Sequence, residues 1–190
     1  IDYRKVLKNA EAAIRIERDA SQPLFVAVGR IVEEKNYVAL AKVCARLQKE
    51  FDFEVWIIGD GKQREIVERI LHEEKCNCVK LLGRQRNPYP YLAEADCMIS
   101  TSLAESYGLA IQEALILGIP VLSTKCPAVE ECLDPRFGML VACEEDAIEE
   151  GMRYLLQNPE AVREYRKCIS EEYDMESLWL HRLKEIENLL

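Results

Sequence analysis

The sequence has no internal repeat, no excess of basic residues, and no apolar run that approaches the ~18 residues of a membrane-spanning helix. A net charge of −9 and the lack of a basic stripe argue against nucleic acid as a main partner. Eight cysteines follow no regular framework and no leader-like stretch is present, so we expect free thiols in a reducing compartment. These absences favour a cytoplasmic protein, and they leave peripheral association with the membrane face open.

The usual signs of a metal site are also missing. Cys76 and Cys78 resemble half of a zinc site, but no second pair and no well-placed histidine completes it. His72 and His181 are isolated on predicted helices and are expected to face solvent. We therefore predict no bound metal, and we expect the cysteines to be core or surface thiols.

Strand-like and helix-like segments alternate through most of the 190 residues. The predicted strands are 24–29, 53–58, 79–82, 97–101, 119–123 and 138–141, and the predicted helices are 1–18, 37–50, 62–75, 88–95, 110–117, 128–133, 144–157, 160–172 and 176–190. This alternation indicates an α/β fold, with a Rossmann-like parallel sheet covered by helices on both faces. The length suits one domain or one large lobe.

Polar loops follow several of the predicted strands. Ligands of open parallel sheets bind at the carboxyl ends of the strands, so these loops should share one edge of the sheet. They are Gly29, Arg30 and Lys35, then Gly59-Asp60-Gly61, then Gly83 and Arg84, and finally the stretch from Glu105 to Leu109.

The stretch from Glu105 to Glu113 carries the strongest chemical signal. Gly108 lies at a predicted strand-to-helix turn, where free N–H groups and the helix dipole favour an anion. Glu105 and Glu113 bracket this turn, and carboxylates would repel a bare phosphate. We therefore expect them to bind hydroxyl groups, and a phosphate flanked by polyols is a sugar nucleotide.

Together these motifs resemble the C-terminal, donor-binding domain of the retaining family 4 (group 1) glycosyltransferases, which have the two-domain GT-B fold. The resemblance rests on the run VGRIVEEKN at 28–36, IGDG at 58–61, Leu82-Gly83, and an E-x7-E motif from Glu105 to Glu113 that contains Gly108-Leu109 and is followed by Ala114-Leu115 and GIPV. One departure is Ser106-Tyr107, where Gly-Phe is commoner, so the donor class is predicted more firmly than the sugar.

The resemblance implies roles for residues at the predicted sheet edge. Arg30 and Lys35 would hold the diphosphate without a metal, in keeping with the lack of any Asp-x-Asp pair, and together with Glu105 they are the predicted catalytic residues. Glu105 would bind the sugar and Glu113 the ribose. The remaining predicted donor contacts are Gly29, Gly83, Arg84, Ser106, Tyr107, Gly108 and Leu109.

Simpler interpretations remain for some of these residues. Arg84 could contact the base or be a surface cation, and Ser106 and Tyr107 could be turn residues whose backbone alone matters. Gly59-Asp60-Gly61 could be a tight turn, since it lacks the G-x-G-x-x-G of dinucleotide sites. As whole-chain alternatives we keep a stand-alone nucleotide-sugar-binding module and a GT-B-like nucleotide-sugar epimerase.

The resemblance also implies an organisation. Residues 1–23 would be a linker with a helical segment, 24–172 the nucleotide-sugar-binding domain, and 173–190 a C-terminal helix. The expected partners are the nucleotide-diphosphate sugar, which is a substrate rather than a cofactor, and an acceptor-binding N-terminal lobe. The chain alone should therefore transfer no sugar.

Overall fold

The computed structural model describes residues 1–13, 16, 18–174 and 176. The predicted C-terminal helix 176–190 therefore lies outside the described residues apart from Glu176, and so does His181. His72 is exposed, as predicted.

A six-stranded, wholly parallel sheet forms the centre of the described structure, in the order β3-β2-β1-β4-β5-β6. The strands are β1 Leu24–Val28, β2 Glu54–Ile58, β3 Val79–Gly83, β4 Cys97–Ser100, β5 Val121–Thr124 and β6 Gly138–Val141. The chain adds strands outward from β1 as far as β3, then returns to the other side of β1 with β4. The predicted Rossmann-like parallel sheet is thus confirmed, and its topological switch point lies between β1 and β4.

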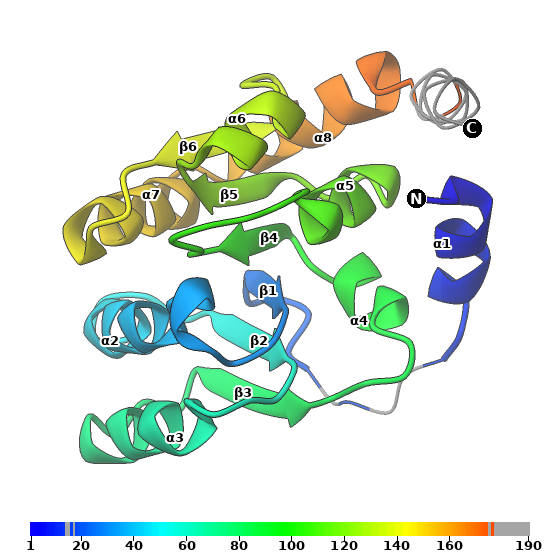
Figure 1. Cartoon of the computed structure of the whole chain (residues 1–190). Coiled ribbons are helices and arrows are strands. Elements are labelled where there is room, and N and C mark those ends of the chain that lie inside the picture. Colours follow the sequence, from blue (N-terminus) through cyan, green and yellow to red (C-terminus); the bar gives the residue numbers. More distant parts are fainter. Residues whose placement is uncertain (14–15, 17, 175, 177–190) are drawn as a thin grey trace.

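Helices cover both faces of this sheet (Figure 1). They are α1 Tyr3–Ala10, α2 Tyr37–Leu47, α3 Arg64–Glu73, α4 Tyr89–Ala93, α5 Leu109–Ile116, α6 Pro127–Cys132, α7 Glu145–Gln157 and α8 Pro159–Glu172, with a short 3-10 helix η1 at Glu33–Lys35. Most predicted boundaries differ from these by one to three residues, a normal uncertainty at helix and strand ends.

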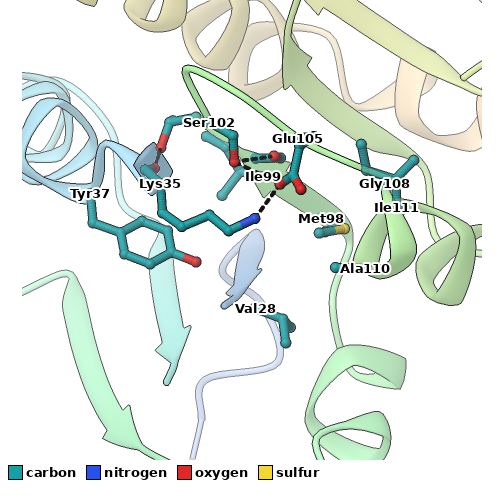
Figure 2. Close-up of a pocket in the computed structure, with 12 residues that line it drawn as sticks. Val28, Lys35, Tyr37, Met98, Ile99, Ser102, Glu105, Gly108, Ala110 and Ile111 are labelled. Atoms are coloured by element: carbon teal, nitrogen blue, oxygen red, sulfur yellow. Dashed lines mark hydrogen bonds and ion pairs between the residues drawn. The ribbon is translucent and has the colours of Figure 1, made fainter. Parts of the chain in front are cut away.

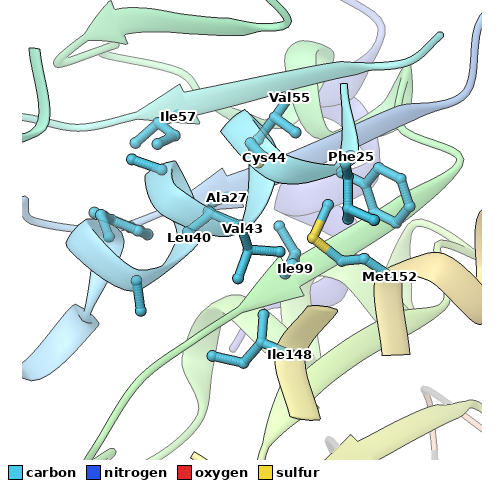
Figure 3. Packing of buried hydrophobic residues seen from close by; sticks show 14 of the residues in the cluster. Phe25, Ala27, Leu40, Val43, Cys44, Val55, Ile57, Ile99, Ile148 and Met152 are labelled. Atoms are coloured by element: carbon cyan, nitrogen blue, oxygen red, sulfur yellow. The ribbon is translucent and has the colours of Figure 1, made fainter. Parts of the chain in front are cut away.

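Alternate residues of β1 bury on opposite faces, which is why its whole sequence is apolar. Phe25 and Ala27 belong to a core cluster with α2, α3 and α7, which includes Leu40, Ile148 and Met152 (Figure 3). Leu24 and Val26 belong to a second cluster with α4, α5, α6 and α8. The two clusters fix the strands between two helical layers, so that the loops beyond the strand ends are free to carry a site.

The predicted first helix is too long. It was expected to reach about residue 18, but α1 ends at Ala10. Arg18 is used instead to anchor the connection to the sheet: its Nη1 donates to the Glu94 carbonyl at 2.7 Å, and its Nη2 lies 3.7 Å from Asp96 Oδ2. These tertiary contacts outweigh the weak helical propensity of a short polar segment.

The predicted fifth strand begins too early. Ile119 was placed in it, whereas β5 begins at Val121. The Ile119 amide donates to the Ala114 carbonyl at 2.9 Å and the Gly118 amide donates to that of Leu115 at 3.0 Å, with Gly118 at φ 73°. This is a Schellman-type helix end, so Ile119 completes α5 rather than starting the strand.

Candidate functional site

The exits of β1 and β2 are locked together through backbone contacts. The Gly29 amide donates to the Ile58 carbonyl at 3.0 Å, and the Ile31 amide donates to that of Asp60 at 2.9 Å. A Cβ atom at Gly59 would lie 1.8 Å from the Gly29 carbonyl oxygen, and one at Gly61 would lie 2.4 Å from that of Ile31. Both glycines are therefore explained by close packing of two turns, which agrees with the simpler interpretation of this motif.

The loop after β1 is tied to the loop after β4. The Thr101 hydroxyl donates to the Lys35 carbonyl at 2.8 Å, and the Leu103 amide donates to the Glu34 carbonyl at 2.8 Å. These bonds join the segment that carries Lys35 to the segment that carries Glu105. As a result, residues 70 positions apart in the chain lie at one place on the sheet edge.

Lys35 and Glu105 form an ion pair inside a small pocket (Figure 2). Lys35 Nζ donates to Glu105 Oε1, and the Ser102 hydroxyl donates to the same oxygen at 2.8 Å. Their side chains are only 22% and 16% exposed. The pair therefore has little solvent around it, which strengthens its attraction relative to a surface pair.

Tyr37 forms part of the pocket wall beneath this pair. Burial, with a smaller contribution from the nearby Glu105 carboxylate, raises the pKa of the Tyr37 phenol. The phenol therefore stays protonated, and it adds no competing negative charge beside Lys35.

The N-terminus of α5 opens onto the same pocket. Gly108 is the N-cap at φ 57°, and no described side chain caps the helix. A Cβ at Gly108 would lie 2.7 Å from the Cys132 sulfur, so both backbone angle and space require glycine. The N–H groups of the first turn lack helical partners, and their dipole favours an anion. The predicted strand-to-helix turn at Gly108 is thus confirmed.

Glu113 lies in a different environment from Glu105. The Tyr89 hydroxyl of α4 donates to Glu113 Oε1 at 2.9 Å, and the carboxylate is half-buried. Burial raises the pKa of Glu113, although the Tyr89 hydrogen bond opposes this, and burial also raises the pKa of Tyr89 to about 12. Glu113 is not among the side chains that line the pocket of Lys35 and Glu105.

The other predicted residues occupy the same edge of the sheet but are more exposed. Arg30 and Arg84 are both solvent-exposed, and neither lines the pocket, while Gly83 ends β3 at φ 66°. Ser106, Tyr107 and Leu109 are exposed around the start of α5, and Tyr107 retains 67% of its surface. Their backbone positions agree with the predicted turn, and their roles stay predictions.

Two polar side chains at this edge were not singled out from the sequence. Ser102 was missed as the second donor to Glu105, and Tyr89 as the partner of Glu113. Ser102 precedes Glu105 by three residues, a spacing at which short loops often form side-chain hydrogen bonds. Tyr89 gave no such signal, since its contact depends on how α4 packs beside α5.

The cysteines agree with the predicted free thiols. All eight are unpaired by disulfides, and the Cys76 and Cys78 sulfur atoms are 3.5 Å apart. Among the described residues, no His, Cys, Asp or Glu side chains gather in groups of three or more that could hold a metal ion. Within the same part of the chain, no helix has the length and apolar character needed to cross a membrane.

Comparison with known proteins agrees with this geometry. The family model described as "Glycosyl transferases group 1" matches residues 9–173. The chain belongs to the group 1 glycosyltransferases. It is therefore an enzyme domain of the sugar-transfer class, as the resemblance predicted.

A curated relative of this glycosyltransferase chain is itself a glycosyltransferase, and solved structures of other proteins share its fold. The chain is 29% identical over 148 residues to an N-acetylgalactosaminyltransferase of Campylobacter jejuni that acts on a diphospho-undecaprenol-linked sugar, over 74% of this chain and 39% of that protein. TarM of S. aureus matches with a TM-score of 0.72 at 22% identity, over 90% of this chain and 37% of TarM. WaaG, a glycosyltransferase of lipopolysaccharide biosynthesis, matches with a TM-score of 0.74 at 20% identity, over 93% of this chain and 46% of WaaG.

These structural matches concern the fold, which is that of a GT-B lobe. The chain spans less than half the length of the curated relatives it matches.

Proposed function

We propose that this chain is the donor-binding lobe of a retaining, metal-independent glycosyltransferase that uses a nucleotide-diphosphate sugar. The observation that carries the proposal is the convergence of Lys35, Glu105 and the uncapped N-terminus of α5 on one pocket. A cation and free N–H groups suit a diphosphate, and a carboxylate beside them suits sugar hydroxyls. The acceptor would be bound by a lobe outside this chain.

The chemistry requires stabilisation of a leaving group. As the glycosidic bond breaks, negative charge builds on the departing diphosphate, and preorganised donors lower the barrier. Lys35 and the first N–H groups of α5 would supply such donors, and Arg30 would add a second cation from the exposed edge. Glu105 would hold the sugar, and Glu113, about one turn inside α5, would bind the ribose.

The relatives support this donor class. TarM was solved in a complex that contains UDP, and the C. jejuni relative transfers N-acetylgalactosamine. UDP is therefore the first nucleotide to test. The retaining outcome and the independence from metal rest on the family resemblance and on the lack of an Asp-x-Asp pair.

The proposal is tested by titrating UDP, GDP and ADP, and their sugars, into the chain by calorimetry, with magnesium and with EDTA. We expect one nucleotide to bind equally well in both. Removal of a charge-assisted phosphate contact in Lys35→Ala or Arg30→Ala should weaken it about ten- to a hundredfold.

Lys62→Ala is the control, because Lys62 is an exposed cation that, unlike Arg30 and Lys35, is not a predicted phosphate contact. A strict magnesium requirement would refute metal independence. Unchanged affinity in both Lys35→Ala and Arg30→Ala, or an equal loss in Lys62→Ala, would refute the phosphate assignment.

The proposed second lobe has its own test. Useful transfer rates need an aligned acceptor and exclusion of water, which one lobe does not provide. We therefore expect the 190-residue chain to bind donor but to transfer no sugar in a product assay. Robust transfer to a defined acceptor by this chain alone would contradict its assignment as one lobe.

A further inference from the structure

Glu113 has a hydrogen-bond partner that the proposed function does not use. Tyr89 lies 24 residues earlier, on a different helix, and its hydroxyl donates to Glu113 Oε1 at 2.9 Å. Within the described part of the chain, no other group donates a hydrogen bond to the Glu113 carboxylate. This bond therefore restricts the orientation of the half-buried carboxylate.

The direction of this hydrogen bond is determined by chemistry. An ionised carboxylate accepts only, so the phenol must donate. The Tyr89 pKa of about 12 keeps its proton in place at neutral pH. Each carboxylate oxygen has two lone pairs, so Glu113 still has acceptor capacity for two neighbouring hydroxyl groups after Tyr89 has used one lone pair.

Tyr89 is itself held in place. Its amide donates to Asn87 Oδ1 at 3.3 Å, and Asn87 Nδ2 donates to the Asn9 carbonyl of α1 at 2.7 Å. Helix α1 packs against both α4 and α5, as Figure 1 shows for α4. The phenol therefore approaches Glu113 from a support that is anchored on two sides.

We propose that Tyr89 is a positioning residue, which orients Glu113 so that its carboxylate receives the vicinal hydroxyl groups of the donor ribose. The inference rests on the proposed function, because it assumes that Glu113 binds ribose. It adds a residue on α4, outside the E-x7-E motif, that determines how well the site distinguishes a ribonucleotide from one without these hydroxyls.

The test measures discrimination rather than affinity alone. The probes are UDP, GDP and ADP, each paired with its 2′,3′-dideoxy form, and the pair whose ribonucleotide binds tightest is used. For the wild-type chain we expect the ribonucleotide to bind about ten- to a hundredfold more tightly than its dideoxy form. This is the difference in affinity that hydrogen bonds to a charged group typically produce. Glu113→Gln should remove most of this ratio.

Tyr89→Phe should reduce the ratio about three- to tenfold, while the affinity for the dideoxy nucleotide stays unchanged. Tyr91→Phe is the matched control: Tyr91 is also on α4, and its hydroxyl donates to Gln85 Oε1 at 3.2 Å instead. The ratio should be unaffected there. Adding Tyr89→Phe to Glu113→Gln should cause no further loss, since the two residues act through one carboxylate.

The outcomes separate the two claims. If Glu113→Gln abolishes discrimination and Tyr89→Phe leaves it intact, the positioning role is wrong and the proposed function stands. Equal weakening of both nucleotides by Tyr89→Phe would mean a merely structural role and would also overturn the inference. If Glu113→Gln itself changes nothing, the ribose assignment fails, and the inference fails with it.

Discussion

The two glutamates that bracket the start of α5 are held by opposite kinds of partner. Glu105 pairs with a cation, Lys35, and accepts from Ser102. Glu113 pairs with a neutral phenol, Tyr89. In the proposed site, the cation that neutralises the Glu105 carboxylate would also have to bind the phosphate, whereas the phenol of Tyr89 has no such second role.

This difference suggests a division of labour. Binding of a diphosphate would draw Lys35 away from Glu105, which leaves Glu105 available for hydroxyl groups only after the phosphate has arrived. Glu113 would keep its hydrogen bond from Tyr89 and would be oriented for hydroxyl groups before the ligand arrives. We expect the Glu105 side to respond to the ligand and the Glu113 side to be preorganised for it.

The largest effect, a loss of folding stability, should come from replacing Gly108, which lies between the two glutamates. Gly108→Ala forces a Cβ to within 2.7 Å of the Cys132 sulfur at a φ of 57°. We expect a loss of about 3 kcal/mol in the free energy of unfolding, from left-handed strain plus overpacking. Urea denaturation measures this directly.

Gly118→Ala is the control for Gly108→Ala, because Gly118 has φ 73° but no atom within 4 Å of its Cβ position. It should lose about 1–2 kcal/mol from backbone strain alone. Adding Cys132→Ala to Gly108→Ala should recover part of the extra loss. Equal losses at the two glycines would show that the sulfur contact is unimportant.

The next effect concerns Glu113. If it binds ribose, its contact exists whether or not a sugar is attached. Glu113→Gln should then weaken nucleoside diphosphate and nucleotide sugar by the same factor, about ten- to a hundredfold, in calorimetric titrations. Weakening confined to the nucleotide sugar would reverse the roles assigned to the two glutamates.

Glu105→Gln should behave in the opposite way. The nucleotide sugar should lose about tenfold or more in affinity. The free diphosphate should bind as well as before or up to a few times more tightly, because Lys35 is released from its ion pair and a negative charge is removed. Melting curves must accompany both titrations, since equal losses on both ligands in both variants would indicate a folding defect.

The smallest expected effect is the pH dependence of the change in unfolding free energy caused by Glu113→Gln. Burial, opposed by the Tyr89 hydrogen bond, raises the folded-state pKa of Glu113 above its unfolded value. The folded chain therefore binds more protons between these two pKa values, so the contribution of Glu113 is most favourable in acid and is lost as pH rises through the folded pKa. Glu113→Gln should gain stability relative to wild type at about pH 7 and lose this advantage near pH 4. A constant difference between the two pH values would contradict the raised pKa.

Much of the fold follows from short-range pattern. The strands were predicted because runs such as 24–29 are apolar throughout, and alternation with helices implied that their carboxyl ends share one edge. That argument was enough to place Lys35 and Glu105 on the same side of the sheet. It gave no account of their direct ion pair, which depends on the hydrogen bonds of Thr101 and Leu103 between the two loops.

Contacts between helices could not be predicted from the sequence, for a different reason. Tyr89 hydrogen-bonds to Glu113 because α4 packs against α1 and α5, and nothing in the local sequence specifies that packing. The end of α1 was misplaced for the same reason, since Arg18 bonds to residues more than seventy positions away. Propensity describes a segment alone, whereas these features are decided by its neighbours.

The backbone lock between Gly29 and Gly59 has a consequence for redesign of the enzyme. A Cβ at Gly59 would lie only 1.8 Å from the Gly29 carbonyl oxygen, and one at Gly61 only 2.4 Å from that of Ile31, so neither position accepts a side chain. Mutant libraries aimed at a new donor preference gain nothing from these positions. Tyr107, two-thirds exposed near the start of α5, can change without disturbing the core, so it is where selection has freedom to act.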